Sequence, residues 1–335
     1  MGAAVYVSNA DSGEISVLRL GDRGELQTRQ QLAVGGQVMP LAISDDRRFL
    51  YAARRSAPLA VLGFRIDPAS GELTPAGQAP LPESMAFIAT DRSGRFLFSA
   101  SYGGGLVAVS PIGADGCPRP AQQVLAAGPK AHAIRSDPAN RHVFATALGS
   151  DRVLQYRFDP ASGRIAPNDP PAFAGRPGAG PRHFVFHPRL PRVYLLNELD
   201  AGLDVLAYDG AAGTLAALQT VSTLAPEVAG EPWAAELRLT PDGRFLYASE
   251  RRASTIAGFA VDGASGRLAP IGHWATQSQP RGMAVDPQGR FLIVAGQLSH
   301  RVGVHRIDPQ GGALELVGEH EVGRNPNWVE AIALG

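Results

Sequence analysis

Residues 240–247 read Thr-Pro-Asp-Gly-Arg-Phe-Leu-Tyr, a tight turn followed by an apolar strand, and variants of this stretch recur along the chain. The apolar pair that ends it recurs as Val5-Tyr6, Leu50-Tyr51, Leu97-Phe98, Val143-Phe144, Val193-Tyr194, Leu246-Tyr247 and Leu292-Ile293. Successive pairs start 45 to 53 residues apart. Periods of this length, each holding several short strands, are typical of propeller blades. The repeat therefore predicts an all-β protein, a seven-bladed β-propeller.

The turns of each unit support this prediction. Pro and Asp early and Gly late, as in residues 240–243, suit tight hairpin turns. A second hairpin, such as Asp-Pro-Ala-Ser-Gly at 159–163, separates the third strand of a unit from its fourth. No segment shows the sustained period of an amphipathic helix.

The ends of the chain are out of phase with the repeat. The chain starts at the strand of an apolar pair, and residues 325–332 resemble the innermost strands of other units. We therefore expect the last strand to close the first blade, begun by residues 1–35, which removes two exposed sheet edges. The repeat runs through 1–335 without a break, which predicts a single domain. The two longest units should carry extra loops at Pro167–Pro181 and Leu224–Pro232.

Composition limits the function classes. Thirty-one basic and thirty-one acidic residues leave no net charge, which argues against nucleic acid or an anionic membrane as partner. The single cysteine, Cys117, cannot form an internal disulfide, which favours a reducing, cytoplasmic setting. No secretory signal pattern and no membrane-spanning apolar run is found. The composition carries no signal for an oligomeric state.

Two rings of candidate side chains are expected at one mouth of the channel. The first lies where the innermost strands begin, at Met39-Pro40, Ser84-Met85, Ala131-His132, Pro181-Arg182-His183, Trp233-Ala234, Pro280-Arg281-Gly282 and Pro326-Asn327-Trp328. The second lies three or four residues past the apolar pairs, at Arg54-Arg55, Ser101-Tyr102, Asn197-Glu198, Glu250-Arg251 and Gln297. Because equivalent positions of a repeat occupy equivalent places around the axis, the polar members should face a common volume.

Each of these residues taken singly also fits a structural role. A lone histidine is more often a hydrogen-bonding core residue than a catalyst, and an Arg or Glu is often half of a blade-to-blade salt bridge. Their convergence in several blades is what favours a site. No His, Asp or Glu spacing matches a zinc or calcium site, and no Gly-rich segment opens a helix, so neither a metal nor a cofactor is expected.

The residues also carry a family resemblance. Gly178 to Pro188, with Pro181-Arg182-His183 at its centre, and Asn197-Glu198-Leu199 resemble the bacterial propeller-type 6-phosphogluconolactonases. So do Gln279 to Gly282 and Ala295 to His300, and the resemblance covers essentially the whole chain. This family shares its fold with the fungal carboxymuconate cyclases.

The resemblance implies hydrolysis of 6-phosphoglucono-δ-lactone in the pentose phosphate pathway, with a small phosphorylated sugar lactone as the partner. The related cyclases place a His, two Arg and a Glu at the channel mouth. At the matching motif positions, the implied catalytic residues are His132, Arg182, Glu198 and Arg251. The residues expected to bind substrate beside them are Arg281, His183, Asn197, Gln297 and His300.

Opening a lactone requires a base for water and cationic groups for the developing oxyanion. Arg182 is expected near the lactone carbonyl, with Arg251 and Arg281 available to the carbonyl or the phosphate. Either Glu198 or His132 could be the base. A carboxylate between arginines keeps a low pKa, whereas histidine titrates near neutrality, so His132 is the favoured base. The alternatives are another sugar lactonase, a lactone-forming cyclase, or a non-catalytic propeller that serves as an interaction scaffold.

Overall fold

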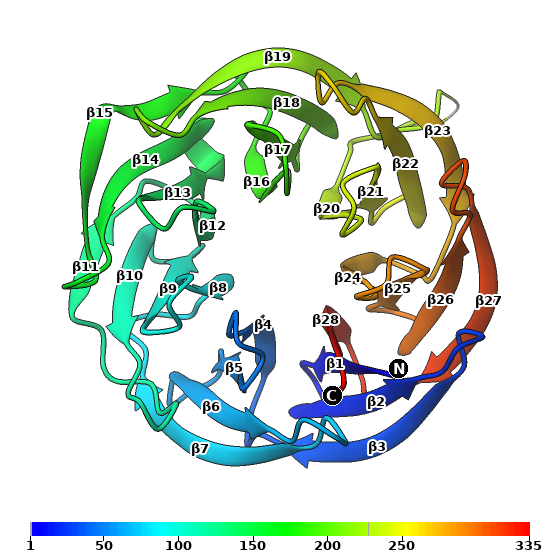
Figure 1. The fold of residues 1–335 in the computed structure, drawn as a ribbon, viewed down its shortest axis with the longest axis horizontal. Helices are drawn as coiled ribbons and strands as arrows, with labels where there is room; N and C mark the ends of the chain where they lie inside the picture. Colours follow the sequence, from blue (N-terminus) through cyan, green and yellow to red (C-terminus); the bar gives the residue numbers. More distant parts are fainter. Residues whose placement is uncertain (1, 227) are drawn as a thin grey trace.

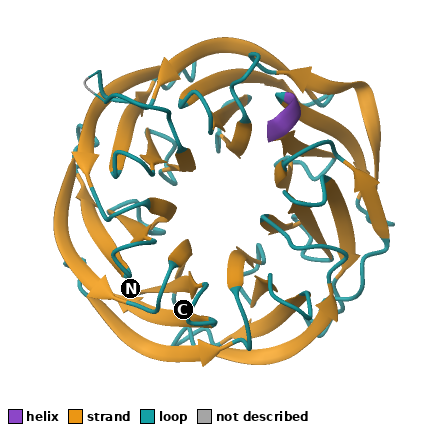
Figure 2. Cartoon of the chain, turned by 180° about the vertical axis from the view of Figure 1, so that it is seen from behind, coloured by secondary structure: helices purple, strands orange, loops and turns teal. Residues whose placement is uncertain are grey.

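The computed structural model describes residues 2–226 and 228–335, which form seven four-stranded antiparallel sheets. The sheets stand as blades around a central axis, each with one edge strand toward the axis (Figure 1). Seen from behind, the ring is built of strands and loops with a short 3₁₀ turn at Leu148–Ser150 (Figure 2). The predicted all-β, seven-bladed propeller is confirmed.

Each blade contributes one strand to each of four positions, counted outward from the axis. The innermost strands are β4 (Val38–Ile43), β8 (Phe87–Thr90), β12 (Ala131–Ser136), β16 (Pro181–Phe186), β20 (Ala234–Leu239), β24 (Pro280–Val285) and β28 (Pro326–Ala333). The second strands are β5 (Phe49–Arg54), β9 (Phe96–Ser101), β13 (His142–Ala147), β17 (Arg192–Asn197), β21 (Phe245–Glu250), β25 (Phe291–Gly296) and β1 (Ala3–Asn9). The third strands are β6 (Ala60–Ile66), β10 (Leu106–Pro111), β14 (Arg152–Asp159), β18 (Gly202–Asp209), β22 (Thr255–Val261), β26 (Arg301–Ile307) and β2 (Glu14–Leu20). The outermost strands are β7 (Leu73–Pro80), β11 (Gln123–Ala126), β15 (Arg164–Ala174), β19 (Thr214–Ser222), β23 (Leu268–Ala275), β27 (Leu314–Glu321) and β3 (Leu26–Ala33).

The two ends of the chain meet in one blade, as the sequence predicts. The C-terminal strand β28 pairs antiparallel with β1, from Ala3 opposite Ala333 to Asn9 opposite Pro326. The blade therefore reads β28-β1-β2-β3, and the termini lie side by side in Figure 1. This pairing closes the ring and supplies β1 with its inner neighbour.

The apolar pair recurs because its two side chains serve two different cores. Successive residues of a strand point to opposite faces of the sheet. On β21, Leu246 packs in the core shared with the preceding blade, and Tyr247 packs in the core shared with the following blade. Both side chains are fully buried. The hydrophobic core is thus a series of layers between blades.

Tyrosines of these pairs also connect one blade to the next by hydrogen bonds. The Tyr247 hydroxyl donates a hydrogen bond to the Gly312 carbonyl, in the outer hairpin of the following blade, at 2.7 Å. The Tyr6 hydroxyl reaches the Gly71 carbonyl in the same way at 2.9 Å. Gly71 has a φ of +79°, so the turn suits glycine, which has no Cβ to strain it. The two sequence signals, the apolar pair and the hairpin glycine, therefore meet in space.

The prediction of an extra loop at Pro167–Pro181 is wrong for most of these residues. Pro167 to Ala174 lie in the outermost strand β15, and only residues 175–180 form a loop before β16. Proline lacks the N–H that a central strand needs, but β15 is the edge strand of its blade and offers no further partner. The second loop, at 224–232, has no strand in its described residues; Glu227 lies outside them.

Candidate active site

Six of the seven innermost strands, all but β8, begin with a local break in register at the mouth of the channel. On β12 the pairing with β13 skips from Ala131 to Ile134, which leaves His132 in the irregular stretch. On β16 the break falls between Pro181 and His183 and frees Arg182. A bulge bends its strand and redirects a side chain that would otherwise point into the sheet face. These breaks are what turn the polar side chains toward the axis.

A buried threonine holds two of these irregular stretches together. The Thr146 hydroxyl on β13 accepts a hydrogen bond from the Ala133 amide at 2.9 Å and donates one to the Arg182 carbonyl at 2.8 Å. Thr146 is completely buried. It thereby satisfies backbone groups beside both His132 and Arg182 that the broken ladders leave without a strand partner.

Replacing Thr146 with valine is expected to lower the free energy of unfolding by about 1–3 kcal/mol, because the shape is kept while a buried amide and carbonyl lose their partner. The midpoint of urea unfolding measures this change. Thr74→Val, on the exposed face of the outermost strand β7, is the matched control and should have little effect. Equal shifts in the two variants would contradict the role of the hydroxyl.

The second ring of side chains comes from residues directly after the second strands. Four of these residues line the cavity: Arg55, Tyr102, Glu198 and Arg251. The residue before each of them points away and makes a structural hydrogen bond. These residues are Arg54, Ser101, Asn197 and Glu250. In each of these predicted pairs, the second residue therefore lines the cavity and the first makes structural hydrogen bonds outside it.

Residues from six of the seven blades line a cavity of about 280 Å³ at the channel mouth. Its lining consists of Arg55, Ala86, Tyr102, His132, Arg182, Glu198, Trp233, Arg251 and Arg281. The four residues implied as catalytic are therefore brought together, although they are far apart in sequence. Arg281 joins them. The charged groups are four arginines and one glutamate among the described lining residues, so the cavity is strongly positive.

Glu198 binds two of the arginines that line the cavity. Its Oε2 accepts hydrogen bonds from Arg182 Nε at 2.7 Å and from Arg251 Nη2 at 2.9 Å. Burial raises the pKa of Glu198, but the two guanidinium groups outweigh it and hold the pKa below its ordinary value. Its Oε1 makes no hydrogen bond to any described residue. That oxygen is available to a water or to a substrate hydroxyl.

The two arginines bound to Glu198 are also fixed by backbone carbonyls. Arg182 Nη1 donates to the Ala235 carbonyl, and Arg251 donates to the carbonyls of Trp233 and Ala234. The Arg251 guanidinium lies 3.9 Å from the centre of the Trp233 ring. Side chains held by this many partners need little reorganisation when charge develops beside them.

His132 is buried and uncharged. Burial, and after it the charge of Arg182, lowers its pKa well below the ordinary histidine value. Its ring packs edge-on against those of Tyr102, 6.0 Å away between centroids, and His183, 5.0 Å away. The sequence predicts a histidine that titrates near neutrality; the surrounding arginines instead keep His132 in its neutral form over a wider range of pH.

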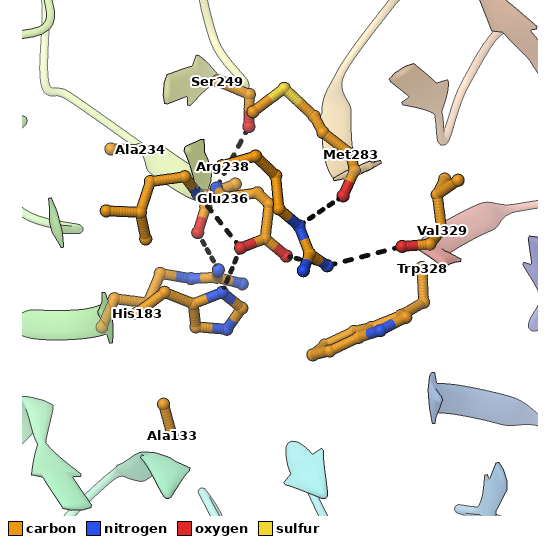
Figure 3. Close-up of polar contacts among 12 residues, drawn as sticks. Ala133, His183, Ala234, Glu236, Arg238, Ser249, Met283, Trp328 and Val329 are labelled. Atoms are coloured by element: carbon orange, nitrogen blue, oxygen red, sulfur yellow. Dashed lines mark hydrogen bonds and ion pairs between the residues drawn. The ribbon is translucent and has the colours of Figure 1, made fainter. Parts of the chain in front are cut away.

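His183 lies behind His132 instead of lining the cavity. Its Nδ1 is 2.8 Å from Glu236 Oε1, and Glu236 also lies 3.5 Å from Arg238 Nη2 (Figure 3). Arg238 in turn donates to the Met283 carbonyl at 2.6 Å. This network links β16, β20 and β24 below the cavity. The structure thus gives His183 a supporting place.

The other residues expected to bind substrate also have partners outside the cavity. The Asn197 amide donates to the Gly202 carbonyl and to Asp204. The side-chain amide of Gln297 donates a hydrogen bond to Asn325 Oδ1, and His300 Nδ1 accepts one from the backbone N–H of Asn325. Four lining residues have no role predicted from the sequence: Arg55, Ala86, Tyr102 and Trp233. Arg55, Tyr102 and Trp233 occupy ring positions named above, whereas Ala86 does not.

Neither a cluster of metal-binding side chains nor a membrane-spanning helix is found in the residues that the structure describes. No group of three or more His, Cys, Asp or Glu side chains in residues 2–226 and 228–335 is arranged to hold a metal ion. The same residues include no helix with the length and apolarity of a membrane span.

Comparison with known proteins agrees with the fold. The sequence model of a family described as lactonase, 7-bladed beta-propeller, matches residues 3–331. A protein named 6-phosphogluconolactonase from Pectobacterium carotovorum is 42% identical over 334 residues, 100% of both chains. One of the same name from Serratia proteamaculans is 39% identical over 329 residues, 98% of both chains. Among solved structures, the periplasmic gluconolactonase of Pseudomonas aeruginosa has a TM-score of 0.93 at 30% identity and covers 100% of both chains. The chain therefore belongs to the lactonase family of seven-bladed β-propellers.

Proposed function

We propose that this protein hydrolyses 6-phosphoglucono-δ-lactone to 6-phosphogluconate, the lactone-opening step of the oxidative pentose phosphate pathway. The observation that carries the proposal is the cavity in which neutral His132 faces two arginines fixed by Glu198. The full-length similarity to relatives named 6-phosphogluconolactonase supports the substrate.

His132 is the proposed base. It takes a proton from water as the water oxygen bonds to the lactone carbonyl carbon, and the carbonyl electrons move onto their oxygen. Arg182 donates to that oxyanion, and Arg251 is held beside it. When the intermediate collapses, the bond to the ring oxygen breaks and His132 returns the proton to that oxygen. The product is the open hydroxy acid.

Glu198 is better suited to orienting than to accepting the proton. The pKa of both Glu198 and His132 lies below its ordinary value, but the Glu198 carboxylate already accepts hydrogen bonds from two guanidinium groups, whereas His132 Nδ1 has no hydrogen-bond partner among the described residues. The free Oε1 of Glu198 can accept a hydrogen bond from the attacking water and hold it near His132. In this proposal neutral His132 acts as the base, and the charged carboxylate of Glu198 positions the water and the two arginines.

The pH dependence follows from the lowered pKa of His132. Only unprotonated His132 can accept a proton, and a lowered pKa means that protonation occurs only at a lower pH. The acid limb of kcat/KM is therefore expected below the ordinary imidazole value of about 6.5. Unphosphorylated glucono-δ-lactone is the right substrate for this test, since a phosphate itself titrates near pH 6. After subtraction of spontaneous hydrolysis, an acid limb at or above 6.5 would argue against His132 as the base.

A second candidate is hydrolysis of an unphosphorylated sugar lactone. One observation favours it: the solved relative from Pseudomonas aeruginosa is named a gluconolactonase. Both activities use the same ring-opening chemistry, and they differ in whether a phosphate must be held.

A direct comparison of the two lactones separates these candidates. If the proposed function is right, kcat/KM for 6-phosphoglucono-δ-lactone is expected to exceed that for glucono-δ-lactone by at least about tenfold, since charge-assisted hydrogen bonds are worth about 1.5–3 kcal/mol. Rates are corrected for spontaneous opening at the same pH. Equal values for the two substrates would favour the second candidate.

We also propose that residues 1–335 act as a single domain, since β28 and β1 join the two ends of the chain in one blade. The proposed partner is the phosphorylated sugar lactone alone, without nucleic acid, because the chain has no net charge. A cytoplasmic location is proposed from the substrate, which is a sugar phosphate.

A further inference from the structure

The arginines of the cavity fall into two groups. Arg182 and Arg251 share the Glu198 carboxylate and are also bound to backbone carbonyls. Arg55 and Arg281 have no carboxylate partner among the described residues. Arg55 Nε donates to the Ser84 hydroxyl at 2.9 Å, and its Nη1 lies 3.2 Å from the Met39 sulfur, so both of its contacts are neutral.

Arg281 is the less satisfied of this second group. None of its nitrogens donates a hydrogen bond to a described residue, and its Nε is fully buried. Burial, followed by the charges of Arg182, Arg251 and Arg55, lowers its pKa. A guanidinium without acceptors and crowded by other cations is stabilised by any anion that reaches it.

These two arginines lie two blades apart on the ring. Arg281 is on β24 and Arg55 follows β5, in the blades on either side of the β28 blade (Figure 1). The β28 blade offers no charge between them: its equivalent residues are Asn327 and Ala10. Arg182 and Glu198 come from the β16 blade, which is three blades from that of Arg55 and two from that of Arg281 (Figure 1). Arg251 comes from the β20 blade, next to that of Arg281.

The charges of the lining match those of a phosphorylated lactone in its transition state. Four arginines and Glu198 give the described lining residues three net positive charges. A phosphate ester carries about −1.5 to −2 at neutral pH, and the developing oxyanion adds about one more negative charge. An unphosphorylated lactone would leave most of the positive charge unbalanced.

We propose that Arg55 and Arg281 form the phosphate subsite of the cavity, apart from the Arg182–Glu198–Arg251 group that handles the carbonyl. This assignment rests on the proposed function and deepens it. It makes Arg55 a specificity-determining residue. A phosphate oxygen takes the place of the neutral acceptors around Arg55, and a second one binds the free donors of Arg281.

The test is the ratio of kcat/KM for the phosphorylated lactone to kcat/KM for the unphosphorylated one. Arg55→Gln is expected to lower this ratio by about 10- to 100-fold, the loss of one charge-assisted contact. Arg281→Gln should lower it as well. Arg54→Gln is the matched control: it removes the same charge one residue earlier, at a side chain bound to the Pro58 carbonyl outside the cavity, and should leave the ratio unchanged.

A second measurement keeps this inference separate from the proposed function. Inorganic phosphate should bind the wild-type protein in calorimetry and bind Arg55→Gln at least about tenfold more weakly. If the wild-type enzyme fails to open the phosphorylated lactone, the proposed function falls, while weaker phosphate binding by Arg55→Gln still supports the subsite. A ratio and a phosphate affinity that are both unchanged in Arg55→Gln would overturn the subsite.

Discussion

Replacing His132 with alanine is expected to lower kcat/KM for 6-phosphoglucono-δ-lactone by about 10²- to 10⁴-fold, the usual contribution of a general base. His132 lines the cavity, is uncharged, and stands among arginines that it does not neutralise. Its removal leaves substrate binding to the arginines largely intact, so the loss should fall mainly on kcat. Steady-state rates corrected for spontaneous hydrolysis measure it.

Two further variants give this prediction its controls. His320→Ala removes a histidine from the outermost strand β27 and should leave the rates unchanged. Glu198→Gln keeps the size of the side chain but removes the charge shared by Arg182 and Arg251, so it should lower kcat through lost positioning. Breaking a buried ion pair lowers the stability of the protein. The rates of Glu198→Gln must therefore be measured at a temperature at which an unfolding curve shows that this variant is folded. Losses below tenfold in both His132→Ala and Glu198→Gln would rule out the assignment.

Deleting residues 325–335 is expected to lower the free energy of unfolding by more than about 5 kcal/mol, as large as the whole stability of many domains. The deletion removes β28, the inner partner of β1 along Ala3–Asn9. It also removes Trp328 and Val329 from two different cores between blades. Urea unfolding should show a transition that is shifted to much lower denaturant or is no longer cooperative.

The matched control keeps every strand and moves only the chain ends. A circular permutant joins residue 335 to residue 2 by a short linker and opens the chain in the exposed hairpin at 161–162. It retains the β28–β1 pairing, so it should unfold with a cooperative transition close to that of wild type. If the truncated protein kept the wild-type midpoint, β28 would not be the element that closes the ring.

The candidate site shows which structural details the sequence alone does not predict. The paired candidates Arg54-Arg55 and Asn197-Glu198 were correctly placed at strand ends, but the sequence did not tell which member faces the axis. The structure sends the second member of each pair into the cavity, because the first is the last residue of its strand and is held by hydrogen bonds there. His183 follows Arg182 directly, and the register break on β16 turns the two apart.

By itself the sequence determined the architecture: the number of blades, the strand content, the closure by the last strand, and the two rings in which polar side chains could meet. These features are local and repeated, since turn chemistry and strand alternation act within a few residues and each unit restates them. The tertiary structure alone decided which side chains share a cavity and in what charge state. Glu198 holds its charge because Arg182 and Arg251 reach it from two different blades, and His132 stays neutral because burial and those arginines disfavour a further cation. Such interactions depend on distances across the ring, and spacing along the chain does not encode them.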